Sequence, residues 1–366
     1  GEGQSIAPEH TTMGEAFRAA GYETFGTGKW HNGHEAYHRS FTDGGEIMFG
    51  GMGDHWNVPA YDFDPSGAYD STIPECVDAF HSNEIRQRGC DHIQAGKHST
   101  ELFADATIDF LQRAPAEKPF FAYVSFMAPH DPRTMPSQFL DMYDPDTVEL
   151  PDNFLGGHPF PTGALRIRDE LLAEFPRSPH EIRRHIAEYY AMITHVDAEI
   201  GRVLDALDKA GRGDNTIVVV AGDNGLAVGQ HGLMGKQSCY EHSVRVPLLF
   251  AGPGIPEGRT SDAFVYLLDL FPTFCDLAGL PTPESVEGRS LYPLLEDPDQ
   301  GFRDSLYFAY ISCQRAVKTR KHKLIEYAVD GQRNTQLFDL ENDPLEKTNL
   351  AGEEAHAATL RELRAE

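Results

Sequence analysis

The sequence predicts an α/β protein in which a mostly parallel central sheet is flanked by helices. Apolar runs of strand length alternate with helical patterns through the first 299 residues. Continuous apolar strands are typical of parallel sheets, because helices cover both faces of such sheets. Near residue 300 the pattern changes to short strands that follow one another and then to a terminal helix. We therefore expect an α/β domain over residues 1–299 and a smaller C-terminal α+β subdomain over residues 300–366.

The N-terminal elements lead to a segment with basic side chains. A helix is expected over residues 12–20, because Thr12 and Glu15 match a capping box and a glycine follows the last turn. A short strand over residues 22–25 comes next. This strand opens into a predicted loop at residues 26–31, with the sequence Gly-Thr-Gly-Lys-Trp-His.

The middle of the chain repeats the theme of a buried strand that ends in a polar loop. Residues 119–127 predict a strand that ends near His130. A Ser-Pro-His-Glu start and apolar residues at a spacing of three to four predict a long helix over residues 178–211. Strands are expected at residues 216–221, before an Asp-Asn-Gly sequence, and at residues 246–251. The C-terminal subdomain is expected to contain strands at residues 306–311, 316–318, 323–327 and 336–339 and a helix from about residue 353.

Three predicted strand ends carry polar side chains. Ligands of parallel sheets bind beyond the carboxyl ends of the strands. In this chain those ends carry Lys29 with His31, then His130, and then Asp223 with Asn224. The Asp-Asn pair offers two hard oxygen ligands for calcium or magnesium, although Asn-Gly is also a common turn sequence. Taken alone, the Lys-Trp-His segment is more typical of an ordinary surface loop than of a reactive site.

Composition limits the classes of partner. Acidic residues outnumber basic residues 57 to 31, which gives a formal charge of −26. Such a surface repels nucleic acid and anionic membranes, and no apolar run is long enough to span a bilayer. We therefore expect no nucleic-acid and no membrane partner. The five cysteines lack zinc-ligand spacing, and a Cys76–Cys90 disulfide is conceivable in an exported protein.

Several motifs occur in an order that points to one family. They are Gly-Lys-Trp-His at 28–31, Ala-Pro-His at 128–130, Gly-Asp-Asn-Gly at 222–225, His-Gly-Leu-Met-Gly-Lys at 231–236 and Tyr-Glu-His-Ser-Val-Arg-Val-Pro at 240–247. The stretches at 314–317 and 337–344 fit the same pattern. Together these motifs resemble those of the type I, formylglycine-dependent sulfatases of the alkaline-phosphatase-like superfamily.

The resemblance implies a role for each matching residue. Lys29 and Lys236 match the lysines that grip the sulfate oxygens. His31 matches the histidine that takes a proton from the hydrated aldehyde when the sulfated intermediate breaks down. His130 matches the residue near the leaving oxygen and is expected to donate a proton to it. These assignments fit the chemistry, because fixed cations in a water-poor pocket stabilise the negative charge that develops on the leaving oxygen.

The resemblance also implies a metal and a modified nucleophile. Asp223 and Asn224 match a pair of metal ligands that usually holds Ca²⁺, and Mg²⁺ is a second candidate. The family nucleophile is formylglycine, made from Cys or Ser in a Cys/Ser-x-Pro-x-Arg motif. No Cys or Ser of this chain begins such a motif. We expect the chain to be incomplete at its N-terminus, with the formylglycine in a missing upstream segment, and to be inactive without it.

Four further residues are weaker candidates for substrate binding: Arg133, His242, His55 and Trp56. Arg133 follows His130 closely, and His242 stands where an acidic residue is more usual in the family. The His55-Trp56 pair fits a glycan subsite or, equally well, a packed loop. Another histidine, His195, falls opposite the apolar stripe of its helix and is therefore expected to be exposed to solvent.

These observations favour a sulfuric ester hydrolase that removes sulfate from a carbohydrate. The alternatives are a phosphomonoester, phosphodiester or phosphonate hydrolase of the same superfamily, and a catalytically inactive protein that binds sulfated glycans. The single Asp-Asn pair favours sulfate, because two-metal phosphatases need more His and Asp ligands. The expected partner is a sulfated small molecule or glycan, and the resemblance implies a periplasmic or secreted protein. The sugar, the sulfated position and the oligomeric state stay open.

Overall fold

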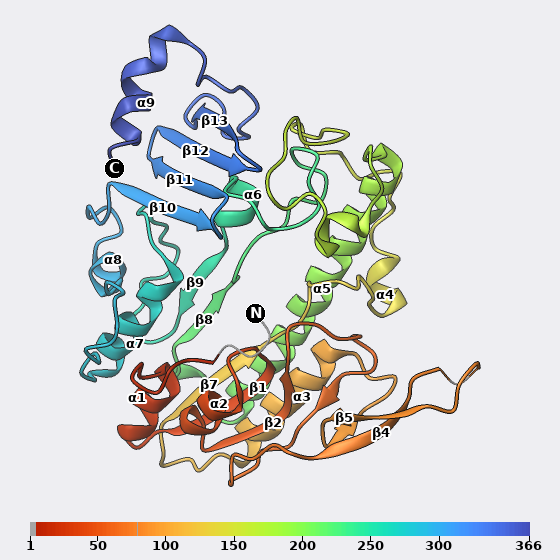
Figure 1. Ribbon diagram of the computed structural model, residues 1–366. Helices are drawn as coiled ribbons and strands as arrows, with labels where there is room; N and C mark the ends of the chain where they lie inside the picture. Colours follow the sequence, from red (N-terminus) through yellow and green to blue (C-terminus); the bar gives the residue numbers. More distant parts are fainter. Residues whose placement is uncertain (1–4, 79) are drawn as a thin grey trace. The chain divides into compact units, whose positions relative to one another are not determined.

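The structure is a computed structural model and describes residues 5–78 and 80–366 (Figure 1). These residues form two compact units, each assembled from several segments of the chain. Unit 1 comprises residues up to 143 together with residues 188–216 and 271–289, whereas unit 2 comprises residues 144–187, 217–270 and 290–366. None of the helices in the described residues is both long and apolar enough to cross a membrane.

Unit 1 contains a three-stranded parallel sheet with the strand order β2-β1-β7. The parallel sheet confirms the α/β class predicted from the continuous apolar strands. Its strands and the three helices nearest in sequence are β1 (Glu23–Trp30), β2 (Asp43–Phe49), β7 (Phe120–Ser125), α1 (Met13–Ala19), α2 (His34–Ser40) and α3 (Ser99–Arg113).

The start of α1 follows the predicted capping box. The Thr12 side chain accepts a hydrogen bond from the Glu15 backbone N–H at 3.2 Å, and the Glu15 carboxylate accepts one from the Thr12 N–H at 2.7 Å. Each bond satisfies a backbone donor that the first helical turn leaves unpaired.

Strand β1 is longer than predicted, because residues 26–30 continue the strand instead of forming a loop. The physical reason is close packing on the glycine backbone. The Tyr37 hydroxyl donates a hydrogen bond to the Gly26 carbonyl at 2.6 Å, and a Cβ at Gly26 would lie only 2.9 Å from the Phe41 ring. Gly26 therefore makes room for aromatic side chains of the α2 region and does not mark a turn.

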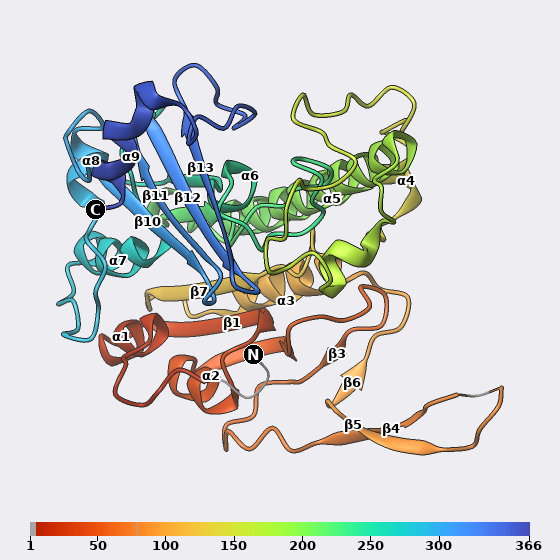
Figure 2. The ribbon, with the colours of Figure 1, turned by 45° about the horizontal axis from the view of Figure 1, so that its top comes forward.

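The remainder of unit 1 consists of short elements. Strand β4 pairs with β5 as an antiparallel hairpin, drawn at the lower right of Figure 2, and β3 pairs with β6. Helix α7 begins at the last residue of a unit 2 segment and continues into unit 1. The bounds are β3 (Pro59–Ala60), β4 (Thr72–Cys76), β5 (Ile85–Gly89), β6 (His92–Ile93), α4 (Ser137–Leu140), η2 (Gly213–Asn215) and α7 (Leu270–Ala278).

The long predicted helix is present as α5 (Pro179–Lys209), which contributes residues to both units. Its first two turns pack in an apolar cluster of unit 2 through Ile182 and Ile186. Further along, Ala191 and Met192 belong to a cluster of unit 1.

The prediction that His195 of α5 is exposed was wrong, because this residue is buried. Its ring lies 4.7 Å from the His98 ring and 4.6 Å from the Phe139 ring. The segment around His195 is therefore covered on more than the single face that the apolar stripe of the sequence indicates.

Unit 2 contains an antiparallel pair, β8 with β9, and a four-stranded antiparallel sheet in the order β10-β11-β12-β13. The four-stranded sheet confirms the four short strands predicted after residue 300. Strands β8 and β9 were expected in a parallel sheet, and the structure instead pairs them with each other. The bounds are η1 (Arg168–Leu172), β8 (Val218–Ala221), α6 (Glu241–Val244), β9 (Leu248–Ala251), η3 (Leu267–Asp269), α8 (Tyr292–Glu296), β10 (Ser305–Tyr310), β11 (Gln314–Thr319), β12 (His322–Val329), β13 (Gln332–Asp339), η4 (Glu354–His356) and α9 (Ala357–Leu363).

All five cysteines carry free thiols. Cys76 is exposed at the end of β4, whereas Cys90 is buried among the aromatic residues of unit 1. The disulfide that the sequence made conceivable between these two residues is therefore not formed.

Candidate active site

The first group of candidate residues lies at the end of β1 in unit 1. Lys29 is partly buried within the strand and pairs in register with Met48 of β2, and His31 is exposed immediately after the strand. Gly28 adopts a φ of +87°, at an irregularity in the register between β1 and β2. A Cβ at Gly28 would lie 2.0 Å from the Ser125 carbonyl oxygen. Only glycine therefore lets β1 approach β7 closely enough to place Lys29 and His31 as observed.

The imidazole of His31 lies against a second glycine. A Cβ at Gly51 would be 2.8 Å from Cε1 of His31, closer than Cβ atoms approach other heavy atoms in real structures. Gly51 follows β2, the strand that neighbours β1. The absence of a side chain at position 51 therefore creates the space that the ring of His31 occupies.

His130 follows β7, which is parallel to β1 and adjacent to it, so the carboxyl ends of both strands lie at the same edge of the sheet. The side chain of His130 is 16% exposed. Its Nδ1 atom is 2.9 Å from the Asp131 carbonyl oxygen and 3.4 Å from the Asp131 carboxylate. If Nδ1–H donates to these acceptors, the other nitrogen that can take part in proton transfer is Nε2.

His55 has a different environment from the one expected for a substrate-binding residue. It is fully buried, and both ring nitrogens have partners. Nδ1 lies 2.6 Å from the Ser99 hydroxyl, and Nε2 lies 2.9 Å from the His130 carbonyl oxygen. Burial lowers the pKa of His55, which favours a neutral ring whose Nε2–H donates to that carbonyl. His55 therefore has no polar atom free for a substrate and instead holds the backbone of His130.

The other two weaker candidates of unit 1 lie near this network. Trp56 is half-buried, and its ring contacts the His98 ring edge-on at 5.1 Å. Arg133 is partly buried three residues after His130.

In unit 2, Asp223 and Asn224 follow β8 directly. The Asp223 carboxylate accepts a hydrogen bond from the Asn224 N–H at 2.9 Å, and the Asn224 amide group donates to the Gly225 carbonyl at 2.9 Å. Among the residues that the structure describes, no hydrogen bond occupies the other carboxylate oxygen or the amide oxygen, so both can serve as ligands. Both are hard oxygen donors, which fit Ca²⁺ or Mg²⁺ better than a softer ion. A Cβ at Gly225 would lie 1.9 Å from the His242 carbonyl, so the Asp-Asn-Gly sequence needs glycine at this position.

The loop that carries Lys236 is fixed by a buried ion pair. Two consecutive backbone N–H groups, those of Met234 and Gly235, donate to the carboxylate of Glu170 at 2.9 and 2.8 Å. The same carboxylate pairs with Arg177 at 2.6 Å, and Arg177 also donates to the Gly232 carbonyl at 3.3 Å. Glu170 and Arg177 are each only 2% exposed. No motif in the sequence marked either residue.

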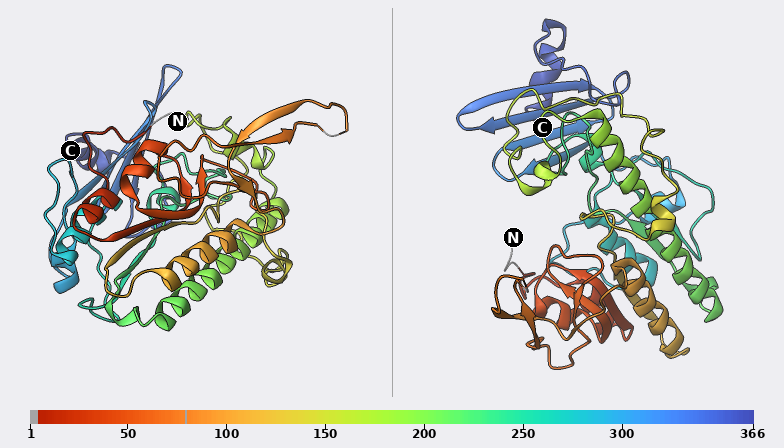
Figure 3. Two further views of the ribbon diagram at one scale, coloured as in Figure 1. Left: turned by 90° about the horizontal axis from the view of Figure 1, so that it is seen from below. Right: turned by 90° about the vertical axis from the view of Figure 1, so that its right-hand side faces the viewer.

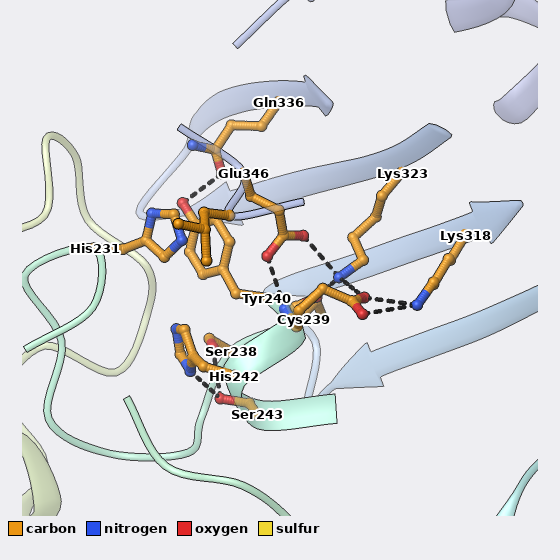
Figure 4. A network of polar contacts seen from close by, with 12 residues as sticks. His231, Ser238, Cys239, Tyr240, His242, Ser243, Lys318, Lys323, Gln336 and Glu346 are labelled. Carbon is orange, nitrogen blue, oxygen red and sulfur yellow. Dashed lines mark hydrogen bonds and ion pairs between the residues drawn. The ribbon is translucent and has the colours of Figure 1, made fainter. Parts of the chain in front are cut away.

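The segment that precedes α6 is anchored to the C-terminal sheet, as Figure 4 shows. The fully buried ammonium of Lys323 pairs with Glu241 at 2.6 Å and with Glu346 at 2.7 Å, and it donates to the Cys239 carbonyl at 3.0 Å. Burial raises the pKa of Glu241, but the Lys323 and Lys318 ammoniums more than offset this effect and hold the pKa below its usual value. Glu241 is therefore ionised and ties α6 to β11 and β12.

His242 lies at the start of α6, beside this anchor (Figure 4). Its Nδ1 is 3.0 Å from the Ser243 hydroxyl, and its Nε2 is buried without a hydrogen-bond partner among the described residues. Burial, followed by the nearby His231 and Lys323, holds the pKa of His242 well below its usual value. The ring is therefore neutral, with its polar atoms turned into the protein.

Comparison with known proteins gives consistent matches. The family profile described as Sulfatase matches residues 2–280, and the profile described as N-sulphoglucosamine sulphohydrolase, C-terminal, matches residues 229–366. An arylsulfatase of Clostridium perfringens is 34% identical over 275 residues, which cover 73% of this chain and 56% of that protein. An N-acetylglucosamine-6-O-sulfatase of Bacteroides thetaiotaomicron is 26% identical over 424 residues, covering 97% of this chain and 71% of the relative.

Solved structures share the fold. One of them, determined in complex with its substrate D-glucosamine-2-N,6-O-disulfate, superposes with a TM-score of 0.75 at 22% identity and covers 100% of this chain and 82% of its own. A phosphonate monoester hydrolase from Silicibacter pomeroyi superposes with a TM-score of 0.70 at 24% identity, covering 100% and 80%. The chain thus spans about half the length of the curated arylsulfatase relative. It covers 82% and 80% of the two solved structures.

Proposed function

Because the chain belongs to the sulfatase family, we propose that it hydrolyses sulfate esters, with a sulfated carbohydrate as substrate. The observation that carries the proposal is the placement of Lys29, His31 and His130 at the same edge of a parallel sheet. One lysine and two histidines at this sheet edge suit a sulfate monoester, which needs charge neutralisation and proton transfer at the oxygens around sulfur.

We propose the following division of work among the residues. Lys29 and Lys236 each bind sulfate oxygens, as the matching lysines of the family do. The imidazolium form of His130 gives its Nε2 proton to the leaving oxygen, and the contacts of Nδ1–H with Asp131 fix the ring for this transfer. His31, exposed after β1, accepts a proton in the later step that releases sulfate. Charge-assisted hydrogen bonds from fixed lysines favour the transition state, in which negative charge develops on the leaving oxygen.

Two chemical groups that the family implies would complete this machinery. Asp223 and Asn224 offer hard oxygens that would hold Ca²⁺, or Mg²⁺ in its place, and the ion would supply positive charge to the sulfate. A formylglycine nucleophile would supply the covalent chemistry, but no Cys or Ser of these 366 residues lies in a Cys/Ser-x-Pro-x-Arg motif. The proposed roles are therefore limited to what the residues of this chain bind, orient and protonate.

A carbohydrate substrate is supported by the relatives. Besides the N-acetylglucosamine-6-O-sulfatase, an ulvan-active sulfatase of Formosa agariphila is 29% identical over 365 residues. The formal charge of −26 opposes long-range attraction of a polyanion, so sulfate recognition must be local, through the lysines and the ion. A secreted or periplasmic location fits a relative described as an extracellular sulfatase, a homologue in Drosophila melanogaster that is 32% identical over 210 residues.

A second candidate function is hydrolysis of a phosphonate or phosphate ester. It is favoured by the fold shared with the phosphonate monoester hydrolase. Measuring turnover of 4-nitrophenyl sulfate, 4-nitrophenyl phosphate and a phenylphosphonate ester separates the two candidates. We expect the sulfate ester to be cleaved fastest. Faster cleavage of either phosphorus ester would favour the phosphate or phosphonate hydrolase over the sulfatase.

A binding experiment tests the lysines even where turnover is absent. We expect Lys29→Ala and Lys236→Ala to weaken the binding of glucosamine 6-sulfate by about 10- to 100-fold, because each loses a charge-assisted hydrogen bond. Lys118→Ala and Lys321→Ala are matched controls, since both lysines are exposed and pair with a surface glutamate. Lysine-dependent binding without any cleavage would support the inactive, glycan-binding alternative. If neither Lys29→Ala nor Lys236→Ala weakens the binding of glucosamine 6-sulfate, the proposed site is refuted.

A further inference from the structure

A group of three metal-ligating side chains lies in unit 1, away in sequence from every residue assigned above. Glu101 comes from α3, and His195 and Glu199 come from α5. Figure 3 shows α3, in gold, beside the green α5, and Arg202 of α5 pairs with Asp105 of α3 at 2.7 Å. His195 and Glu199 are four residues apart and therefore project from the same face of α5.

The donor atoms of these three residues are close enough to share one ion. One ligand atom from each of them lies within 4.8 Å of the other two, and Nε2 of His195 is 3.9 Å from a carboxylate oxygen of Glu101. A tetrahedral zinc ion, bound at about 2.0–2.2 Å, holds its donors about 3.4 Å apart. A small rotation of the partly exposed Glu101 side chain would close the remaining gap.

His195 supplies independent evidence that a ligand is missing. Its side chain is 1% exposed, and neither Nδ1 nor Nε2 has a hydrogen-bond partner in the part of the chain that the structure describes. An imidazole buried without partners is unfavourable, because its nitrogens lose their hydrogen bonds to water. The Phe139 ring stacks on His195 and the His98 ring packs against it at a tilt, but neither contact is a hydrogen bond to its nitrogens.

The charges around these residues also suit a cation. A neutral imidazole has a lone pair on one nitrogen, and Nε2 of His195 lies 3.9 Å from the Glu101 carboxylate. Ligand atoms of Glu101 and Glu199 lie within 4.8 Å of each other, so the two carboxylates repel when both are ionised. The nearby cations, Arg202 and Lys97, pair mainly with Glu199 and Asp105. A cation between His195, Glu101 and Glu199 would relieve the repulsion and bind the free imidazole nitrogen.

We propose that Glu101, His195 and Glu199 form a binding site for a divalent transition-metal ion of the zinc type. One imidazole nitrogen with two carboxylate oxygens suits Zn²⁺ or Co²⁺, whereas Ca²⁺ prefers six to eight oxygen ligands. Arg202 holds one oxygen of Glu199 and leaves the other for the ion. The partial exposure of Glu101 admits a water molecule as fourth ligand. The ion would join α3 to α5, beside the ring of His98.

The test is zinc binding by chelator-treated protein, followed by titration calorimetry, with Co²⁺ as a spectroscopic probe of the ligand set. Glu101→Gln removes a ligand from a partly exposed position, and Asp105→Asn is the matched control, one helical turn later and with the same change of charge. Removing a residue that only hydrogen-bonds a metal ligand weakens metal binding by about 10- to 100-fold. Glu101→Gln removes a ligand itself, so we expect it to weaken zinc binding by at least about tenfold. Asp105→Asn should change it by less than about threefold, because this residue is not a ligand.

A second variant and a competition complete the test. His195→Gln should abolish the visible Co²⁺ absorption that arises from nitrogen ligation, and excess Ca²⁺ should leave bound zinc in place. The proposal is overturned if the wild-type protein binds no zinc, or if Glu101→Gln and Asp105→Asn weaken binding equally, which would indicate non-specific attraction to an acidic surface. Displacement of zinc by calcium would overturn it as well.

Discussion

Replacing Glu170 by Gln tests whether a buried ion pair fixes the loop of Lys236. One oxygen of the carboxylate accepts from the Gly235 N–H, and the other accepts from the Met234 N–H and from Arg177. A glutamine offers a single acceptor oxygen and places an amide N–H₂ against the remaining donors. At least one buried donor would then lose its partner, at about 1–3 kcal/mol, and Arg177 would lose its counter-charge. Breaking a buried pair in this way typically costs about 3–5 kcal/mol.

Urea denaturation provides the measurement, with the free energy of unfolding compared between wild type and variant. We expect Glu170→Gln to lose about 3–5 kcal/mol, whereas the same change at Glu341 should cost less than about 0.5 kcal/mol. Glu341 is the matched control, because its pair with Lys321 is exposed and 3.7 Å long. A loss below about 1 kcal/mol for Glu170→Gln would refute the idea that this carboxylate organises the loop.

Three further predictions concern other parts of the chain. Gly28→Ala should destabilise the protein by at least about 2 kcal/mol more than Gly21→Ala, since both positions have a positive φ but only Gly28 faces a backbone clash; equal losses in urea denaturation would contradict the clash. His231→Asn should make folding less sensitive to acid, because burial lowers the pKa of His231 to about 4. Above about pH 6.5 the ring is neutral in the folded and the unfolded chain, so it does not affect the free energy of unfolding. Below that pH the free energy of unfolding of the wild type falls by about 1.4 kcal/mol per pH unit toward pH 4. An unchanged slope in the variant, measured over that window, would exclude His231 as a cause. His55→Phe should cost about 1–3 kcal/mol, because the His130 carbonyl and the Ser99 hydroxyl lose a buried partner; a change below about 0.5 kcal/mol would show that water replaces the imidazole.

Local sequence signals predicted the elements whose structure depends on near neighbours. The capping box of α1, the Ser-Pro start of α5 and the four C-terminal strands follow from patterns within a few residues. The same signals failed where distant residues decide the outcome. Gly26 suggested a loop, but the Tyr37 hydroxyl and the Phe41 ring occupy the space that a side chain would need, and the strand continues.

Pairing between strands also lay beyond local signals. Residues 216–221 and 246–251 read as apolar strands in the sequence, and both are present as β8 and β9. Their direction relative to each other depends on the path of the chain between them. An apolar run is compatible with either direction, so the sequence alone did not reveal the antiparallel pair.

Motifs found the candidate reactive side chains but not the groups that hold them. Lys29, His130 and Lys236 stand in short sequence motifs. The His130 backbone is held by His55, which is 75 residues away, and the Lys236 loop is held by Glu170, 64 and 65 residues before the amides that it binds. The His55-Trp56 pair was compatible with a packed loop, but its local sequence does not reveal the contact with His130, and nothing in the local sequence marks Glu170 as buried.

The supporting residues share one physical property, which is burial of an ionisable group whose polar atoms are all in use. Displacing such a group costs more free energy than displacing an apolar residue, because apolar contacts cannot replace its hydrogen bonds to backbone amides or carbonyls. His55 and Glu170 therefore restrict the adjacent loops to one conformation, in the way that preorganised catalytic groups require. His195 departs from this rule, because it is equally buried and its nitrogens have no hydrogen-bond partner among the described residues. That difference is the reason to expect an ion at His195 and none at His55.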